Sequence, residues 1–527
     1  MNSRERLAAF RLPAAFRFNR AVLVSLAACA LLLLAGSNHS ARAATIQVPA
    51  GGDLQAALDR AQPGDEVVLQ AGAAYVGNFA LPVKTGSSFI TIRSSRCAEL
   101  PAGVRVKPAD APAMARLATP NAMPVLVAPV RSHHWRLQCL EFTQGATVGE
   151  YGYSLVQLGD GSAAGSQKTL DTVPSHFEFD RVIIRARDER TAVHRGITLD
   201  SAHTTVRNSY IYDIKWNGVE TQALGGTNGS GPFTIENNYL EAAGIQILFG
   251  GAPPAIPGLV PSDIRIRNNH FFKPLKWRQG DPAYAGRVWT VKNLIEFKNA
   301  RRVLIEDNLL ENSWPHAQIG WGIVINTGSD SGPANVVEDV TFVRNTLRNI
   351  SNGINIRGME ANETATRTKR ITIRDNVIER LGAYHAEGGK LFQLLNATDD
   401  VVIDHNTVRD SLVARSFLIL EGVPAAKHAR LVVTNNVGPF GLYGVLGAGG
   451  YFGTFAFEQH ATAWTFSKNA LLGTPPDQQA RNAGNYFVAS VEAAVKLLGT
   501  DGQPVGARTL ATPAPTPAPT PVAPPKP

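Results

Sequence analysis

Carboxylates, amides and cations recur at equivalent positions of six short apolar segments in this sequence, and such side chains can transfer protons or neutralise charge. The segments are GVETQ at Gly218, GIQIL at Gly244, LIEFK at Leu294, GIVIN at Gly322, GINIR at Gly353 and LFQLL at Leu391. Successive side chains of a β-strand point to opposite faces, so Val219 and its apolar equivalents are expected to point inward. The residues that follow them then form an outward row of Glu220, Gln246, Glu296, Val324, Asn355 and Gln393, with Gln222, Lys298, Asn326 and Arg357 two positions further on.

Two reactions are consistent with these residue types. If the segments stack as neighbouring strands, Glu220 and Glu296 lie two strands apart, about 9.6 Å, near the wide end of the carboxylate spacing in inverting glycosidases. An elimination next to a uronate carboxylate needs a cation that neutralises the carboxylate and a base that removes the α-proton. Lys298 and Arg357 are the expected cations, and His316 or Lys298 is the expected base.

The outward row also predicts a binding surface about 25 Å long. The amides assigned to substrate binding are Gln246, Asn326, Asn355 and Gln393. Two less specific interpretations remain open: the row is an ordinary solvated sheet face, and His316 is an ordinary surface histidine in a corner.

The segment Lys273–Lys292, KPLKWRQGDPAYAGRVWTVK, is unusually rich in aromatic and basic residues. Aromatic rings stack on the faces of sugars, and cations pair with carboxylates or sulfates. We therefore predict that Trp277, Trp289, Lys276 and Arg278 form a clamp for an acidic glycan. The alternative is a flap that packs its aromatic side chains against the wall of the fold.

A longer repeat indicates which elements position these side chains. An apolar-x-apolar strand followed by a polar pair, usually ending in Asn, occurs ten times between Phe177 and Leu471. The equivalent polar residues are Ser209, Asn238, Asn269, Asn308, Asn345, Asn376, Asn406, Asn436 and Asn469, with steps of 29, 31, 39, 37, 31, 30, 30 and 33 residues. A period near thirty without helical periodicity predicts a solenoid of strands. The expected fold is all-β, a right-handed parallel β-helix whose coils stack their strands.

The recurrent Asn residues are expected to be structural. At a tight corner Asn tolerates left-handed backbone angles, and its amide can bond to the Asn stacked on it.

The chain ends differ from the repeat region. Residues 1–43 combine several arginines, an apolar run from Ala21 to Ala35 and the sequence Ala41-Arg42-Ala43, which predicts a signal peptide cleaved near Ala43 and a secreted or periplasmic protein. The β-helix is expected to span 44–508, with a short amphipathic helix around Asp53–Ala61 that covers its first coil. Residues 509–527 are rich in Pro, Ala and Thr, which predicts a disordered tail.

Net charge bears on the expected partners, and the cysteines bear on a possible disulfide. The formal net charge is +8, but residues 1–43 carry six Arg and one Glu, so the remainder carries only +3 and gives no reason to expect nucleic acid. Cys29 belongs to the predicted signal peptide. In an oxidising compartment the remaining pair, Cys97 and Cys139, is expected to form a disulfide, with two buried thiols as the alternative.

The sequence also resembles a known group of proteins. DLQAALDRAQPGDEVVLQAG near the N-terminus, the Asn-bearing coils and GTDGQPVGA near the C-terminus resemble the secreted right-handed β-helix proteins of the pectin-lyase-like superfamily. The resemblance covers nearly all of residues 45–508. It implies the fold more specifically than the activity, because this superfamily contains lyases, hydrolases and members without known activity.

The function expected from the residues and the resemblance is binding, with cleavage, of a polysaccharide, preferably anionic, by lyase or glycoside hydrolase chemistry. The alternative is a non-catalytic glycan-binding or surface-structural β-helix. Glu220 and Glu296 could hold calcium, but no compact oxygen-ligand loop supports it, so no metal or cofactor is expected. We expect a monomer without nucleic-acid partners or stable membrane insertion.

Overall fold

The computed structural model describes residues 43–146, 151–332, 334–359, 367–422, 426–473 and 484–508. The chain divides into two units, Met1–Ala44 and Thr45–Pro527, and every strand and helix described belongs to the second unit. The expected signal peptide, apart from Ala43, and the expected tail at 509–527 lie outside the described residues.

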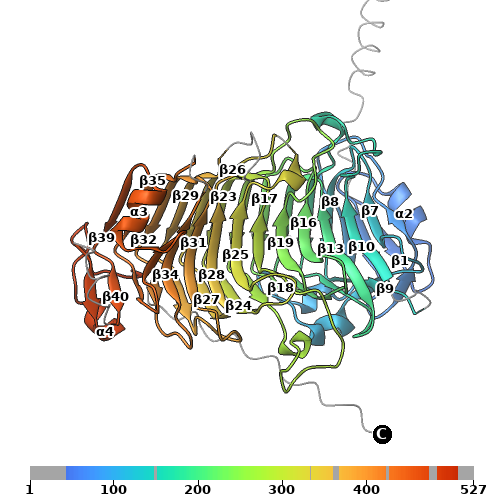
Figure 1. Cartoon of the computed structure of the whole chain (residues 1–527). Helices are drawn as coiled ribbons and strands as arrows, with labels where there is room; N and C mark the ends of the chain where they lie inside the picture. The colour runs from blue at the N-terminus through green and yellow to red at the C-terminus, as the bar shows by residue number, and fades with distance from the viewer. Residues whose placement is uncertain are drawn as a thin grey trace, which may run out of the picture. The chain divides into compact units, whose positions relative to one another are not determined.

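Three long sheets of 14, 13 and 14 strands build the second unit (Figure 1). Sheet A contains β1 (Thr45–Val48), β2 (Glu66–Leu69), β5 (Ile90–Ser94), β8 (His133–Gln138), β11 (Ser175–Asp180), β14 (Ala202–Arg207), β17 (Phe233–Glu236), β20 (Ser262–Arg267), β23 (Ala300–Glu306), β26 (Val337–Val343), β29 (Lys369–Arg374), β32 (Asp399–Asp404), β35 (Ala429–Thr434) and β39 (Trp464–Ser467). Sheet B contains β3 (Ala74–Val76), β6 (Ala115–Thr119), β9 (Leu140–Gln144), β12 (Ile183–Arg185), β15 (Tyr210–Ile214), β18 (Tyr239–Ala242), β21 (His270–Phe272), β24 (Leu309–Ser313), β27 (Thr346–Ile350), β30 (Val377–Glu379), β33 (Thr407–Val408), β36 (Val437–Pro439), β40 (Ala470–Leu472) and β41 (Tyr486–Val488). Sheet C contains β4 (Phe79–Ala80), β7 (Leu126–Ala128), β10 (Tyr151–Leu158), β13 (Ala192–Leu199), β16 (Gln222–Gly226), β19 (Ile245–Phe249), β22 (Ile295–Phe297), β25 (Trp321–Asn326), β28 (Asn352–Arg357), β31 (Lys390–Leu395), β34 (Ser416–Glu421), β37 (Val445–Gly447) and β38 (Tyr451–Phe452).

Each coil of the solenoid gives one strand to each sheet, so neighbouring strands of a sheet come from successive coils. The paired strands run parallel, apart from β37 and β38, which pair antiparallel. In sheet A, for example, Ile264 pairs with Phe233 of the coil before and Val303 of the coil after. The three sheets and the parallel pairing confirm the expected β-helix.

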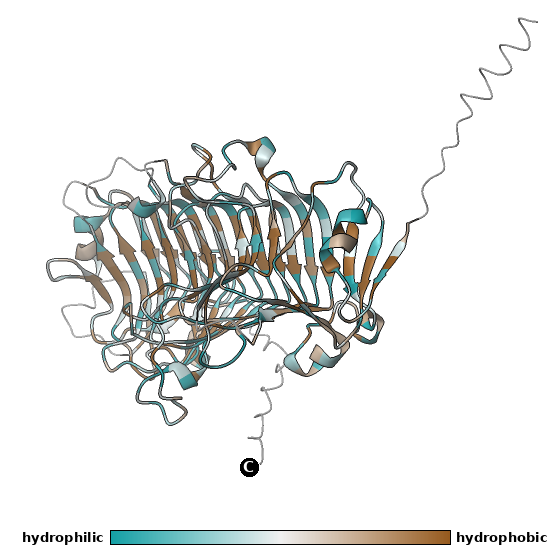
Figure 2. Ribbon diagram, turned by 90° about the vertical axis from the view of Figure 1, so that its right-hand side faces the viewer, coloured by the Kyte–Doolittle hydropathy of each residue, from teal (hydrophilic) through white to brown (hydrophobic). Residues whose placement is uncertain are grey.

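The interior follows the period-two pattern of the sequence. Ile264 and Ile266 are 1% and 0% exposed, whereas Arg265 between them is exposed. Figure 2 shows hydrophobic segments at the same height in successive strands, which stack into one continuous core. Because a single coil buries its apolar side chains only against its neighbours, the core depends on stacking.

A ladder of asparagines runs along the corner between sheets A and B. The Nδ2 amide of Asn308 donates to Oδ1 of Asn345 at 2.9 Å, and Asn345 donates in the same way to Asn376 at 3.1 Å. Each of these side chains also accepts a hydrogen bond from the backbone N–H of the preceding ladder residue. The same bonds join Asn238, Asn269, Asn308, Asn345, Asn376, Asn406, Asn436, Asn469 and Asn485.

The ladder confirms the structural role of these residues but corrects the expected backbone. The left-handed conformation belongs to the residue before each ladder Asn, such as Asp307 (φ 57°) before Asn308 and Arg344 (φ 56°) before Asn345. The corner residue turns the chain, so the following Asn can point its amide into the stack.

Irregular segments lie at both ends of this corner. Arg105 Nε donates to the backbone carbonyl of Asn237 at 3.0 Å, and its Nη2 donates to that of Asn268 at 2.8 Å. Near the C-terminus, the backbone N–H groups of Thr500 and Ala507 donate to Asn435 Oδ1 and Thr407 Oγ1, both at 2.8 Å. Each segment therefore bridges several coils.

Three α-helices occur in the described residues: α2 (Leu54–Arg60), α3 (Thr454–His460) and α4 (Val491–Ala494). Asp53 caps α2 by accepting a hydrogen bond from the N–H of Ala56 at 2.9 Å. Leu54 and Leu58 of this helix belong to the main core. Helix α2 thus occupies the segment that was expected to cover the first coil.

The expected disulfide between Cys97 and Cys139 is present, with a Cα–Cα distance of 5.4 Å. Both cysteines lie in a small apolar cluster with Leu100, Val106 and Met114, separate from the main core. The disulfide therefore ties the irregular segment after β5 to the coil stack.

Candidate functional site

The outer face of sheet C carries five of the residues predicted from the sequence, and Lys298 follows directly after one of its strands. Glu296 pairs with Val324, Val324 with Asn355, and Asn355 with Gln393, on the neighbouring strands β22, β25, β28 and β31. Asn326 pairs with Arg357 one position further along the face. This part of the predicted row is aligned as expected, although alignment alone does not test the assigned roles.

The predicted alignment of Glu220 and Gln246 is wrong. Ile247 pairs with Ile295, which places Gln246 beside Leu294 rather than Glu296. Gln246 is 0% exposed, and its Nε2 donates to the carbonyl of Phe272 at 3.0 Å, so its side chain points into the corner of the coil. Glu220 lies before β16 and has no place in the strand register.

A bend at the start of these strands explains the error. Leu294 and Ile295 are consecutive residues, yet both belong to the main core, and so do Ala223 and Leu224. Two successive inward side chains break the alternation on which the alignment depended. The estimated spacing of about 9.6 Å between Glu220 and Glu296 therefore does not apply.

Glu296 and Lys298 are the centre of a buried polar cluster on this face. Glu296 is 2% exposed, and its Oε2 accepts a hydrogen bond from Asn293 Nδ2 at 2.9 Å. Lys298 Nζ lies 3.8 Å from Glu296 Oε1 and 2.6 Å from Asp330 Oδ2. Asn326 Nδ2 lies 3.5 Å from Glu296 Oε1, at the limit of a hydrogen bond.

The two charged groups of this cluster have shifted proton affinities. Burial raises the pKa of Glu296, although Lys298 and Lys292 oppose the shift. Burial lowers the pKa of Lys298, but Glu296 and Asp330 outweigh it, so that its pKa is raised. Lys298 therefore keeps its proton, which favours its predicted role as the neutralising cation over its predicted role as the base.

Glu220 joins the cluster from the neighbouring corner. It forms an ion pair with Lys292, and its Oε1 accepts a hydrogen bond from Gln222 Nε2 at 3.0 Å. Gln222 Oε1 in turn accepts from Arg195 Nε at 2.6 Å. The polar face therefore continues toward the N-terminal coils through Gln222, which the sequence pattern included, and Arg195, which it did not.

Three contributors to the cluster, Lys292, Asn293 and Asp330, were absent from the predicted site. Lys292 and Asn293 immediately precede the LIEFK segment, and Lys292 also ends the aromatic loop. An alignment that included the residues before each strand could have found them. Asp330 lies between β25 and β26, where sequence spacing gives no indication of which strand it meets.

A chain of hydrogen bonds extends the face toward the C-terminal coils. Asn355 Nδ2 donates to Gln393 Oε1 at 2.8 Å, and Gln393 Nε2 donates to Glu421 Oε1 at 2.5 Å. Arg357 lies next to this chain, between Asn326 and Leu395 in the strand register.

His316 lies in the turn between β24 and β25 and is exposed. Its Nδ1 accepts a hydrogen bond from the backbone N–H of Val291 at 3.3 Å, so the turn contacts the segment leading to Lys292. This places His316 near the edge of the cluster without a direct contact to Glu296 among the described hydrogen bonds.

The predicted aromatic clamp is wrong. Trp277 and Trp289 are 2% and 4% exposed and pack in a small apolar cluster with Val291 and Trp314. Their rings cannot stack on a sugar in this conformation. The flap alternative is correct, because large aromatic rings are more stable packed against the fold than exposed to water.

The two cations predicted for the clamp are also engaged away from the polar face. Lys276 pairs with Glu189 at 3.0 Å, and Arg278 pairs with Asp281 at 3.3 Å while lying over the ring of Tyr384. Lys276 and Arg278 therefore stabilise the flap and do not meet Glu296 or Lys298.

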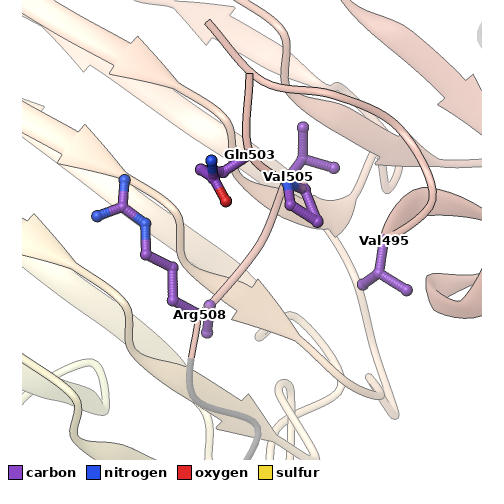
Figure 3. Close-up of a pocket in the computed structure, with 6 residues that line it drawn as sticks. Val495, Gln503, Val505 and Arg508 are labelled. Carbon is purple, nitrogen blue, oxygen red and sulfur yellow. The ribbon is translucent and has the colours of Figure 1, made fainter. Parts of the chain in front are cut away.

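Other features of the described residues do not define a site. Among them, no group of three or more His, Cys, Asp or Glu side chains is arranged to hold a metal. No helix in this part of the chain has the length and hydrophobicity needed to cross a membrane. A hollow of about 330 Å³ at the C-terminal end is lined by Val495, Gln503, Val505 and Arg508, away from sheet C, and Figure 3 shows Arg508 extending away from Val495.

Comparisons with known proteins identify the class of fold. A family model described as a right handed beta helix region matches residues 195–408. With the three parallel sheets, this match establishes a right-handed parallel β-helix, and the resemblance to pectin-lyase-like proteins is confirmed as a resemblance of fold. A search of curated protein sequences found no match.

Solved structures with similar folds include several enzymes. An alginate lyase from Paenibacillus sp. str. FPU-7 is 17% identical over 66% of this chain and 97% of its own, with a TM-score of 0.30. The PL6 family alginate lyase AlyGC is 13% identical over 84% of this chain and 53% of its own, with a TM-score of 0.46. The pectate lyase Pel9A is 13% identical over 90% of this chain and 91% of its own, with a TM-score of 0.33. These similarities concern the fold and carry no argument about chemistry.

Proposed function

We propose that this protein binds an anionic polysaccharide along the outer face of sheet C and cleaves it beside Glu296 and Lys298. The observation that carries the proposal is the buried carboxyl group of Glu296, whose pKa is raised, next to the half-buried Lys298, which stays charged. Buried titratable groups whose pKa is shifted by burial and by a charged neighbour occur often at catalytic sites.

The dimensions of the face suit a polymer. Polar side chains occur on this face from Arg195 on β13 to Glu421 on β34, which is seven strand spacings, or about 34 Å, with the apolar Leu248 and Val324 between them. A small molecule would contact only a fraction of this length. The parallel sheet also holds the side chains at fixed intervals, as a repeating ligand requires.

The cluster can perform either of the two expected reactions. In an elimination, Lys298 neutralises the uronate carboxylate and the ionised Glu296 takes the α-proton; a C=C bond then forms as the C–O bond to the leaving sugar breaks, and the leaving oxygen takes a proton from water. In a hydrolysis, protonated Glu296 donates its proton to the glycosidic oxygen while Glu220 activates a water. Both reactions assign proton transfer to Glu296, and Arg357 binds a further acidic group.

The proposal includes the location and state of the protein. Residues 1–43 direct export and are removed near Ala43, and the protein acts outside the cytoplasm as a monomer. The composition of residues 1–43 supports export.

A non-catalytic glycan-binding or structural role is the second candidate. The bonds from Asn355 to Gln393 and on to Glu421 favour it, because these groups bond to one another and not to a ligand. Polar groups that are already paired contribute less to binding, since a ligand must replace existing bonds.

One experiment separates these functions. The purified mature protein is mixed with alginate, polygalacturonate or, as a neutral reference, dextran, and unsaturated products are followed by ultraviolet absorbance and reducing ends by a colorimetric assay. Elimination gives the absorbance, and hydrolysis gives reducing ends without it. Glu296→Gln keeps the size of the side chain but removes its titratable carboxyl group, so it should abolish turnover and retain binding.

The matched variants test the binding face. Lys298→Ala with Arg357→Ala should weaken binding of the acidic polymers by tenfold or more. Arg265→Ala with Lys369→Ala removes the same charge from sheet A and should change little. Equal binding by both double variants would remove sheet C from consideration, and binding without any cleavage would favour the non-catalytic role.

A further inference from the structure

An exposed aromatic side chain lies at the N-terminal end of the polar face. Tyr153 on β10 is 53% exposed, and its ring centroid lies 4.8 Å from that of His194 on β13. His194 also contacts Trp216 edge-on, with 6.5 Å between the two ring centroids. Tyr153 is therefore the outer member of a short column of rings.

His194 connects this column to the candidate site. Glu220, the residue paired with Lys292, lies close enough to influence the pKa of this imidazole. The next residue along the strand, Arg195, donates to Gln222. The aromatic column and the polar face are thus continuous through adjacent residues.

The imidazole that supports Tyr153 is uncharged near neutral pH. Burial and the neighbouring Arg195 lower the pKa of His194 to about 4, although Glu220 opposes the shift. Its Nδ1 is buried, and no hydrogen-bond partner for it exists in the part of the chain that the structure describes. The uncharged imidazole contacts the rings of both Tyr153 and Trp216, so it supports Tyr153 from one side.

We propose that Tyr153, backed by His194, is a stacking platform for one sugar residue of the polysaccharide bound on sheet C. This inference rests on the proposed function and adds a subsite that neither the sequence pattern nor the catalytic cluster indicated. A sugar ring has an apolar face of C–H groups that packs on an aromatic ring, while its hydroxyl groups remain in water. The exposed ring of Tyr153 offers this surface, whereas the buried flap tryptophans do not.

The position of the platform fixes what it can affect. Strand β10 lies four strand spacings from β22, so Tyr153 is about 19 Å from the level of Glu296. A sugar on Tyr153 is therefore several residues away from the bond that is cleaved. Its interaction is the same in the ground state and in the transition state, so it changes KM and leaves kcat unchanged.

The test compares Tyr153→Ala, Tyr153→Phe and Tyr153→Trp on alginate and polygalacturonate fragments of defined length. Tyr153→Ala should raise KM, or Kd if the protein does not cleave, about three- to tenfold for octasaccharides. Disaccharides should show no change, because they are too short to reach from Glu296 to Tyr153. The Phe and Trp variants should keep the affinity of the original protein. Leu170→Ala, at another residue that is 63% exposed, is the control and should have no effect.

Each outcome has a definite meaning. If Tyr153→Ala binds octasaccharides as well as the original protein while Lys298→Ala with Arg357→Ala binds poorly, the platform is refuted and the proposed function stands. If neither variant changes binding, both proposals fail. An equal loss for disaccharides and octasaccharides would also overturn the platform, because the effect would then be local to the catalytic cluster.

A second measurement covers the case in which Tyr153→Ala does not fold. Tetranitromethane nitrates exposed tyrosines, and peptide mass spectrometry reports each site separately. In the unaltered protein, octasaccharides should slow nitration of Tyr153 at least threefold, whereas disaccharides should not. Unchanged nitration of Tyr153 at saturating octasaccharide would overturn the inference.

Discussion

Removing the carboxylate of Asp330 should strengthen the binding of an acidic polymer, which is the opposite of what most site mutations do. Asp330 lies 2.6 Å from Lys298, and its side chain is 45% exposed. It therefore pairs with the same ammonium group that is proposed to bind the substrate carboxylate. A substrate must displace this internal partner before it can pair with Lys298. Asp330→Asn keeps the size of the side chain and removes the competing charge.

The size of the effect follows from the exposure of the pair. Partly exposed ion pairs contribute about 0.2 to 1 kcal/mol, so removing the competitor should tighten binding by about 1.4- to 5-fold. Lys298 remains charged in the variant, because Glu296 also raises its pKa. The gain should shrink as salt increases, since salt screens charges near the surface.

Titration calorimetry with alginate or polygalacturonate fragments at two salt concentrations measures this effect. Asp281→Asn removes one negative charge from the flap, where Asp281 pairs with Arg278, and controls for the change in net charge. Combining Asp330→Asn with Lys298→Ala should give no gain over Lys298→Ala alone. Weaker binding by Asp330→Asn, or a gain no larger than that of Asp281→Asn, would refute the role of Lys298.

Three further predictions concern the scaffold. Asn345→Ala should lower the free energy of unfolding by about 3 kcal/mol in urea titrations, because it leaves buried ladder groups unpaired; a change no larger than that of the exposed Asn217→Ala would contradict the ladder's role. Burial lowers the pKa of His428 to about 4, so the unfolded chain binds its proton first, and stability should fall by up to about 3 kcal/mol as the pH drops from 6.5 to 4. His428→Gln should flatten that part of the stability profile, and an unchanged slope would count against it. Trp277→Ala should destabilise the flap by about 3 to 5 kcal/mol and expose 273–292 to proteolysis, whereas wild-type resistance would mean that the ring is not packed as described.

The sequence predicted the fold because the same physical constraint repeats in every coil. Alternating residues such as Ile264 and Arg265 specify which side of a strand is buried, and the recurrent Asn specifies where the chain turns. Both patterns can be recognised within the sequence of a single coil, without knowing how the neighbouring coils are placed. The left-handed residue before each Asn was missed because Asp, Asn, Arg and His all occupy that position and leave no single-letter pattern.

The site was only partly predictable because its members come from places where the repeat is interrupted. Glu296 and Asn355 could be aligned, since their strands keep one register. Gln246 could not, because two consecutive inward residues shift the alternation. For Trp277 the composition was correctly noted, but whether a flap faces a ligand or its own fold depends on packing that sequence spacing does not contain.

The asparagine ladder has a consequence for how such a protein can change during evolution. Its hydrogen bonds are the same whether 30 residues separate two partners, as for Asn376 and Asn406, or 39, as for Asn269 and Asn308. Extra residues therefore lie in loops between the strands and leave the hydrogen bonds of the ladder unchanged. Loops can be lengthened without altering the ladder, and the duplication or loss of a whole coil changes the core contacts only of the coils on either side of it. The length of the outer face and the loops beside it can thus diverge between descendants while the ladder keeps every coil in place.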